Sequence, residues 1–139
     1  MQKRTFILLK YSLILIILFH ACNKDEVLEK VLNKRTVIIY MAADNNLSDD
    51  AYANLEEIKQ GFKEKDTKLI IFIDPADYEP QILEISPSGS KIVKTYQELN
   101  SADAAKMKQV LSDIIGLYTA GEYGLVLWSH GTSWTPASR

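Results

Sequence analysis

The amino-acid sequence predicts an α/β fold that is built around a parallel β-sheet. Three short runs of apolar, largely β-branched residues have the character of strands buried on both faces. Two amphipathic stretches between them carry apolar residues three and four positions apart, as helices do. Strands that alternate with helices in this way form right-handed crossovers between parallel strands, and the helices then cover the sheet.

The three predicted core strands span residues 36–42, 68–74 and 124–128. A small antiparallel hairpin is predicted from residues 82–85 and 91–96, because a Ser-Pro-Ser-Gly-Ser turn separates these two runs. We expect this hairpin to be peripheral. Three parallel strands alone make a small sheet whose last strand is an exposed edge, so the chain is expected to be the front part of a larger domain.

Both predicted helices have recognisable ends. The first is expected to start at Ser48 as its N-cap, with two aspartates following in the positively polarised first turn. The second is expected to open at Ser101, with Asp103 near its start, and to end at Gly121. Their predicted buried faces consist of Ala51, Leu55, Ile58 and Phe62 in the first helix, and of Met107, Val110, Leu111, Ile114 and Tyr118 in the second.

Residues 1–21 are predicted to be a secretory signal peptide. Three basic residues near the start are followed by nine uncharged, mostly apolar residues, 11–19, and then by the small residue Ala21. This apolar run is shorter than the about 20 residues that span a membrane. The alternatives are a short N-terminal membrane anchor and a buried helix.

The only cysteine, Cys22, directly follows this segment. Residues 19–22, Phe-His-Ala-Cys, resemble a bacterial lipobox, in which the cysteine thiol carries the lipid and becomes the mature N-terminus. Residues 23–26, Asn-Lys-Asp-Glu, resemble the export signal of surface lipoproteins in Bacteroidetes-type bacteria. Residues 22–35 are then a polar tether. The prediction is a lipid-anchored protein of the cell envelope, exposed on the outer membrane and attached to it through Cys22.

The composition excludes several classes of protein. With a single cysteine among 139 residues, the chain cannot form an internal disulfide, a Cys-x-x-Cys redox pair or a cysteine-rich zinc site. The formal net charge is −2, and removal of residues 1–21 leaves 118 residues with 13 basic and 18 acidic side chains, a net charge of −5. Such a chain lacks the basic face of a nucleic-acid-binding protein, so no nucleic-acid partner is expected.

Polar residues follow each predicted core strand at its carboxyl end, where ligands bind in open parallel sheets. The first strand runs into Asp44, Asn45 and Asn46, which either form the turn before the helix or line a cleft. The third runs into His130 and Gly131. Histidine transfers protons near neutral pH, and glycine leaves a backbone N–H accessible to a developing oxyanion. From position alone, His130 is either such a functional group or a strand-end residue satisfied by local backbone hydrogen bonds.

Other signals of a functional site are weak or absent from the sequence. Asp74 and Asp77 follow the second strand, but two carboxylates without further ligands do not predict a metal site. Ser129 and His130 are neighbours on a strand and point to opposite faces, so they are not a hydrolase pair, and no nucleophile elbow is present. A Rossmann-like nucleotide binder is a weaker alternative, which the missing glycine fingerprint opposes.

Two motifs in the sequence resemble those of the clostripain-related cysteine peptidases. Residues 36–47, Thr-Val-Ile-Ile-Tyr-Met-Ala-Ala-Asp-Asn-Asn-Leu, followed by a helix that contains Glu-Glu-Ile at 56–58, resemble the opening of the family's domain. Residues 123–131, Tyr-Gly-Leu-Val-Leu-Trp-Ser-His-Gly, together with Trp134, resemble its histidine motif. The resemblance implies a caspase-like three-layer sandwich with a parallel central sheet, of which residues 36–139 are the N-terminal part, truncated after the third core strand.

The resemblance also implies a Cys–His dyad that hydrolyses peptide or protein substrates, often after Arg or Lys. His130 matches the catalytic histidine of the family, and the N–H of Gly131 matches its oxyanion donor. Some members respond to calcium, but no residue here can be assigned as a calcium ligand, and no cofactor is expected. The nucleophilic cysteine of the family lies beyond the histidine, where this sequence has none, so the chain is expected to be inactive alone. The alternative from another class is a surface lipoprotein that acts as a binding module without catalysis.

Overall fold

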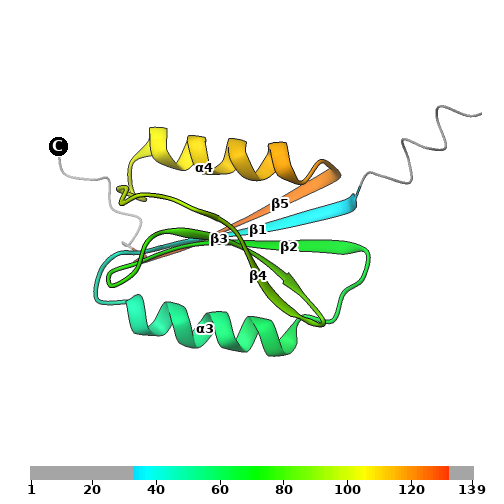
Figure 1. Ribbon diagram of the computed structural model, residues 1–139, viewed down its shortest axis with the longest axis horizontal. Coiled ribbons are helices and arrows are strands. Elements are labelled where there is room, and N and C mark those ends of the chain that lie inside the picture. Colours follow the sequence, from blue (N-terminus) through cyan, green and yellow to red (C-terminus); the bar gives the residue numbers. More distant parts are fainter. Residues whose placement is uncertain (1–32, 132–139) are drawn as a thin grey trace, which may run out of the picture. The chain divides into compact units, whose positions relative to one another are not determined.

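The computed structural model describes residues 33–131 and confirms the predicted α/β sandwich. One helix packs on each face of a five-stranded sheet (Figure 1). The predicted signal peptide and Cys22 lie outside the described residues, and within these residues no helix is both long and apolar enough to cross a membrane. The elements are β1 (Asn33–Ala43), α3 (Ser48–Gly61), β2 (Thr67–Pro75), β3 (Gln81–Ser86), β4 (Gly89–Thr95), α4 (Ala104–Leu117) and β5 (Ala120–Trp128).

The strand order is β4-β3-β2-β1-β5, with β1 paired in parallel to β2 and β5. In this register Ile38 of β1 stands between Ile70 of β2 and Leu125 of β5, which confirms the predicted parallel centre. β3 and β4 extend the sheet in the antiparallel sense. The prediction of a peripheral hairpin is wrong for β3, because this strand lies between β2 and β4 and buries Ile82 and Ile85 in the two cores.

Each face of the sheet carries its own hydrophobic core because side chains alternate along a strand. Beneath α4, Tyr40 stacks on Phe72 with ring centroids 4.6 Å apart, and Phe72 meets the edge of Tyr96 at 6.0 Å. Val110 and Ile114 of α4 are fully buried against this cluster, as their helical spacing predicts. The core beneath α3 consists of Met41, Ala43, Ala51, Leu55, Leu69, Ile71, Ile73, Leu83 and Ile85.

The predicted start of the first helix is wrong by one residue. Ser48 is the first residue of α3, and the N-cap is Leu47, which provides no side-chain hydrogen bond. Ser48 is buried, and its hydroxyl accepts a hydrogen bond of 3.1 Å from the N–H of Ala76. This side chain therefore ties the start of α3 to the end of β2 and is not available to cap its own helix.

Both predicted ends of the second helix also differ from the structure. Asp103 is the N-cap of α4, since its carboxylate accepts a hydrogen bond of 2.9 Å from the N–H of Lys106. Ser101 lies before this cap and is buried. Gly121 does not end the helix, because α4 ends at Leu117 and Gly121 is already part of β5.

The first strand begins earlier than predicted. Asn33, Lys34 and Arg35, which the sequence places in the polar tether, are the first residues of β1. Arg35 pairs across to Glu122 of β5, and its Nη2 lies 2.8 Å from the carboxylate oxygen of that residue. Polar residues can begin this strand because Lys34 and Arg35 lie at the rim of the sheet, where their side chains stay exposed.

β5 is an edge strand within the described part of the chain, as predicted, and it hydrogen-bonds only to β1 there. Its side chains remain accessible on both faces of the sheet. Leu125, Val126 and Leu127 are 48%, 47% and 63% exposed, in contrast to the fully buried residues of β2. A long apolar edge of this kind is a site for pairing with a further strand.

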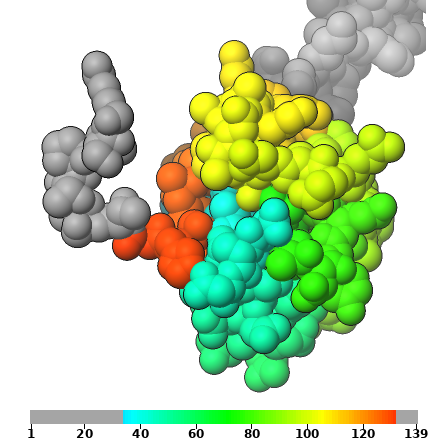
Figure 2. All heavy atoms as spheres, turned by 90° about the vertical axis from the view of Figure 1, so that its left-hand side faces the viewer, coloured from blue at the N-terminus to red at the C-terminus, as the bar shows by residue number. Residues whose placement is uncertain are grey.

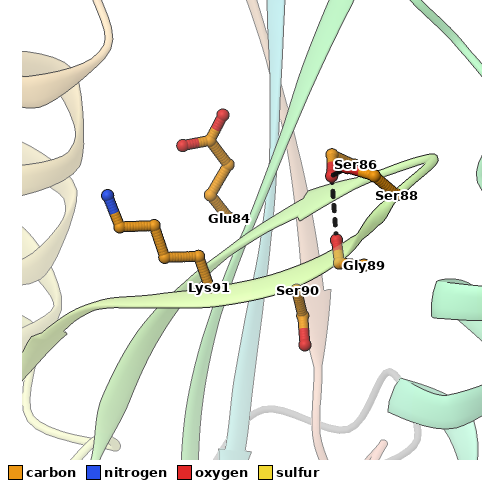
Figure 3. Close-up of a pocket in the computed structure, with 6 residues that line it drawn as sticks. All are labelled: Glu84, Ser86, Ser88, Gly89, Ser90 and Lys91. Carbon is orange, nitrogen blue, oxygen red and sulfur yellow. Dashed lines mark hydrogen bonds between the residues drawn. The ribbon is translucent and has the colours of Figure 1, made fainter.

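The turn between β3 and β4 lies at the opposite edge of the sheet from the carboxyl ends of the parallel strands. Gly89 has a φ of 137°, a backbone conformation that side chains other than glycine's rarely adopt. The hydroxyl of Ser86 donates a 3.0 Å hydrogen bond to the carbonyl of Gly89 and closes the turn (Figure 3).

Glu84 of β3 links two strands to the segment after α4. Its carboxylate accepts hydrogen bonds from Lys68 Nζ of β2 at 2.5 Å and from the hydroxyl of Tyr118 at 3.0 Å. Lys91, its cross-strand partner on β4, points to the same side of the hairpin (Figure 3). The hydrogen bond from Lys68 is the main cause that lowers the pKa of Glu84.

Asp113 of α4 forms a second link of the same kind. Its carboxylate accepts hydrogen bonds from Lys94 Nζ at 2.6 Å and from the hydroxyl of Tyr96 at 2.8 Å. The hydrogen bond from Lys94 lowers the pKa of Asp113, and that from Tyr96 adds to the effect. Glu84 and Asp113 thus both fasten the carboxyl-terminal end of α4 to the sheet.

Asp74 is the one carboxylate that the sheet buries completely in the described residues. It lies near the end of β2, opposite Ala42 of β1. Within residues 33–131 neither carboxyl oxygen makes a hydrogen bond of good geometry, although Ser101 is close enough to oppose the effect of burial in part. Burial raises the pKa of Asp74, so the ionised form is costly in the folded state.

Glu84→Gln is expected to lower the free energy of unfolding at pH 7 by about 1–2 kcal/mol, because it weakens charge-assisted hydrogen bonds in a partly buried site. Because folding lowers the pKa of Glu84, this stabilisation is present above the unfolded value and is lost on acidification. Urea denaturation from pH 7 to pH 3 should therefore show the wild type and variant converging. The exposed Glu57→Gln is the control, and an equal loss there would contradict the role of Glu84.

Asp74→Asn is expected to act in the opposite direction and to raise the urea midpoint at pH 7. The substitution removes a buried carboxylate whose ionisation costs stability, a gain of about 1 kcal/mol. Because folding raises the pKa of Asp74, the difference from wild type should shrink as the pH falls below that pKa. The exposed Asp77→Asn serves as the matched control, and a destabilised Asp74→Asn at pH 7 would show that the carboxylate has a favourable partner.

Candidate active site

The carboxyl ends of β1, β2 and β5 meet at one edge of the sheet because the three strands are parallel. Figure 2 looks onto this edge, where the end of β5, in orange-red, lies beside the cyan connection between β1 and α3. The yellow segment that leads into α4 lies above them in the same view. The fold thereby brings together two predicted site residues, Asn46 and His130, that are 84 positions apart in the sequence.

His130 follows the last residue of β5 by two positions and is exposed at this edge. Its Nε2 lies 2.7 Å from Oδ1 of Asn46, in the connection between β1 and α3. The local backbone hydrogen bonds that the sequence offered as an alternative do not account for this imidazole, since its hydrogen bond goes to a side chain. Nε2 is therefore held by Asn46, while the rest of the imidazole stays open to solvent.

The three residues after β1 have different surroundings. Asn45 forms the turn, because its Oδ1 accepts a 2.8 Å hydrogen bond from the N–H of Leu47 and its carbonyl accepts one of 3.1 Å from the N–H of Ser48. Asn46 is exposed and contacts His130, and Asp44 is exposed. Of the two predicted roles, formation of the turn before the helix thus applies to Asn45. Asn46 instead contacts the candidate catalytic residue, His130.

The end of β5 is fastened to its neighbours just before His130. The hydroxyl of Ser129 donates a 2.9 Å hydrogen bond to the carbonyl of Ala42, one residue beyond the last paired position of β1 and β5. The indole N–H of Trp128 donates one of 3.2 Å to Oδ1 of Asn54 in α3. These two hydrogen bonds attach β5 to its neighbours at and beyond its last residue paired with β1. They hold the backbone from which His130 projects.

A cavity of about 470 Å³ opens between the end of β5 and the start of α4. The hydroxyl of Tyr40 donates a 2.9 Å hydrogen bond to the carbonyl of Ser101 and holds the segment before α4 over the sheet. Burial raises the pKa of Tyr40 to about 12, so the hydroxyl keeps its proton. The residues that line the cavity are Tyr40, Ala42, Ser101, Ala102, Ala104, Met107, Leu127, Trp128, Ser129, His130 and Gly131, and Asp44, Asn45 and Asn46 are not among them.

Gly131 lies at the mouth of this cavity. A Cβ atom at this position would meet no described atom within 4 Å, so steric crowding inside the described structure does not require a glycine. The backbone at Gly131 is therefore accessible to a bound molecule. Such access is required if a carbonyl oxygen is to approach the Gly131 N–H.

The described residues contain no group of three or more His, Cys, Asp or Glu side chains that could hold a metal ion. Asp74 is buried inside the sheet, whereas Asp77 is exposed in the following loop, so the two do not face a common site. The predicted lipid attachment point, Cys22, falls outside the described residues. The site is thus defined by an imidazole, a glycine backbone and a largely apolar cavity.

An imidazole that is held through one ring nitrogen can accept or donate a proton through the other. The sequence identifies His130 and Asn46 as candidates, but it does not reveal the roles of Ser129 and Tyr40, which fix the segments around His130. In the sequence Tyr40 looks like any other residue of a buried strand. The hydrogen-bond partners of Tyr40 and Ser129, which are Ser101 and Ala42, lie far away along the chain. The only local signal of Tyr40 and Ser129 is a hydroxyl within or directly after an otherwise apolar strand.

Comparisons with known proteins agree with this geometry. The model of the clostripain family matches residues 39–139. A cysteine protease from B. fragilis is similar in structure with a TM-score of 0.69 and 35% sequence identity, over 78% of this chain and 98% of that one. No curated protein matches the chain.

Two longer solved structures are also similar. An inactive zymogen of a C11 protease from Parabacteroides distasonis has a TM-score of 0.67 and 36% identity, over 74% of this chain and 32% of its own. A secreted C11 cysteine protease from Bacteroides thetaiotaomicron, in complex with an irreversible peptide inhibitor, has a TM-score of 0.66 and 31% identity, over 76% and 31%. The chain thus spans about a third of the length of these two relatives.

The family model covers most of the chain, and a solved cysteine protease that is 35% identical shares its fold over 78% of the chain. The chain therefore belongs to the clostripain family.

Proposed function

We propose that this chain supplies the histidine part of a cysteine endopeptidase active site. His130 is the proton-transfer group, and the N–H of Gly131 stabilises the oxyanion. The observation that carries the proposal is the placement of His130 at the carboxyl end of β5, fixed by Asn46 and beside an open cavity, in a member of the clostripain family. Ligands of open parallel sheets bind at this edge.

The proposed reaction is acyl transfer through a thiolate. The imidazole of His130 takes the proton of a cysteine thiol, and the sulfur then forms a bond to the carbonyl carbon of the peptide. The protonated imidazole returns its proton to the leaving amine as the C–N bond breaks, and water then hydrolyses the acyl-enzyme. The Gly131 N–H donates to the carbonyl oxygen while it carries negative charge.

The thiol has to come from polypeptide outside this sequence, because the only cysteine is Cys22. The exposed apolar edge of β5 suits a further strand, and one paired in parallel would place its own carboxyl end beside His130. The two longer relatives have about three times the matched length and so contain room for such strands. On this basis the 139-residue chain is inactive alone.

Peptides are the proposed substrates, with cleavage after Arg or Lys. A relative that is 31% identical binds an irreversible peptide inhibitor, which supports a peptide as the ligand of this edge. The preference for Arg or Lys rests on the family resemblance. Within the described residues, the cavity wall beside His130 is apolar and carries no carboxylate, so a basic side chain would be bound by residues outside this region.

The proposed location is the cell envelope, with a lipid on Cys22 as the anchor. The support is the sequence of residues 1–26, and a relative from Bacteroides thetaiotaomicron is described as secreted. A single acyl chain binds membranes only weakly, so stable attachment needs the several chains that a bacterial lipoprotein carries.

His130→Ala should reduce the kcat/KM for Arg- and Lys-containing peptides by about 1,000-fold or more in a protein extended through the nucleophilic cysteine, because the dyad loses its base. A fluorogenic peptide assay measures the effect, and the 139-residue chain should give no turnover in the same assay.

The exposed Glu57→Ala on α3 is the control for this assay and should retain wild-type activity. Retained activity in His130→Ala would remove His130 from the mechanism. Robust turnover by the 139-residue chain would overturn the need for an external thiol.

Cys22→Ala should move the protein from the membrane fraction to the soluble fraction of bacterial cells, because it removes the thiol to which the lipid is attached. Fractionation with incorporation of a labelled fatty acid measures both effects, and Asn23→Ala is the neighbouring control. If Cys22→Ala stays in the membrane fraction after an alkaline wash, lipidation at this residue is not the anchor.

A further inference from the structure

We propose that Asn46 is a positioning residue that holds His130 in the Nε2–H tautomer, so that Nδ1 is the ring atom that accepts the proton. The inference rests on the proposed function in that it takes His130 as the base of the peptidase. It adds that Asn46 determines which of the two ring nitrogens of His130 accepts the proton.

The contact as assigned, with the amide oxygen of Asn46 facing the ring, corresponds to one tautomer of His130. Oδ1 of Asn46 lies 2.7 Å from Nε2 of His130, a short distance for a hydrogen bond. An amide oxygen can only accept, so the proton of this bond belongs to Nε2. In a neutral imidazole the other nitrogen, Nδ1, is then unprotonated and is the only ring atom that can act as a base.

The connection that carries Asn46 is itself well fixed. The N–H of Asn45 donates to the carbonyl of Ala43 at 2.7 Å, and the Asn45 amide donates to the carbonyl of Ala42 at 3.3 Å. That same Ala42 carbonyl accepts the hydroxyl of Ser129. Asn46 and His130 therefore project from two segments that share one anchoring carbonyl, which holds these segments side by side.

Asn46 is not needed to form this turn. The turn is closed by the side chain and carbonyl of the preceding residue, Asn45, which bond to Leu47 and Ser48. In the described structure the side chain of Asn46 is exposed, and its hydrogen bond is the one to His130. A role in orienting the imidazole explains this residue, whereas a role in local folding does not.

An amide differs from a carboxylate in its electrostatic effect on the imidazole. A carboxylate at the same distance would stabilise the imidazolium and favour the protonated ring, whereas an amide orients the ring without adding charge. Asn46 can therefore fix the tautomer without protonating the base. An aspartate at this position separates the two effects, because it keeps the acceptor and adds the charge.

The test uses the full chain in detergent micelles, with ¹⁵N-labelled histidine. The chain has two histidines, His20 and His130, and His20→Gln assigns their signals. Long-range ¹H–¹⁵N spectra at high pH report which ring nitrogen carries the proton. The wild type is expected to show His130 as the Nε2–H form, and Asn46→Ala to move the ratio toward that of a free imidazole.

Asn46→Asp is expected to keep the Nε2–H form and to move the titration midpoint of His130 upward by about one pH unit relative to wild type. Ser88→Asp is the matched control, because it adds the same charge in the β3–β4 turn at the opposite edge of the sheet. An Nδ1–H tautomer in the wild type overturns the proposal. So does an Asn46→Asp midpoint that moves no further than that of Ser88→Asp.

These spectra do not depend on peptidase activity, so they fail or succeed separately from the proposed function. In the extended active protein, Asn46→Ala should lower kcat about 10- to 100-fold with little change in KM, since misplacing the base affects the chemical step. An unchanged kcat with an altered tautomer overturns the positioning role. A wild-type extended protein without turnover, but with the Nε2–H form intact, overturns only the proposed function.

Discussion

The parallel pairing of β1 with both β2 and β5 is the constraint on which the rest of the structure depends. Because three strands run in the same direction, their carboxyl ends meet at one edge, and the polar residues after them have to share it. The same pairing forces the connecting segments across the faces of the sheet as α3 and α4. This arrangement buries β1 on both faces, with Tyr40 and Met41 in the cores on opposite sides of the sheet.

The polar side chains fall into two groups. One group links α4 to the sheet, and the other fixes the segments around His130 at the carboxyl ends of the parallel strands. Glu84 and Asp113 each combine a lysine with a tyrosine, and they fasten α4 to the sheet on the side away from β5. On the side toward β5, Tyr40 and Ser129 bind backbone carbonyls and shape the surroundings of His130. The end of α4 beside β3 and β4 is therefore fastened by hydrogen bonds, whereas a cavity opens between its start and the end of β5.

The sequence predicted the fold better than the contacts of the site, for a physical reason. Strands and helices are determined by apolar periodicity over short stretches, so five strands and two helices, with the buried faces of both helices, follow from the pattern. The amphipathic run after Ser48 predicts this residue as an N-cap, but its hydroxyl accepts a hydrogen bond from the N–H of Ala76, which no local pattern shows. The contact of Asn46 with His130 joins residues 84 positions apart and leaves no signal in either segment.

The pairing of the first and last strands also has a kinetic consequence. The hydroxyl of Ser129 and the carbonyl of Ala42 are 87 positions apart, so bringing them together closes one of the longest loops in the described chain. Contacts of such high separation form late and slow the folding of a domain. When the chain emerges from its amino-terminal end, β1 has to remain without its second partner until β5 follows. The geometry around His130 then exists only in a molecule in which β5 has paired with β1, so the contact between His130 and Asn46 depends on one of the longest-range pairings of the sheet.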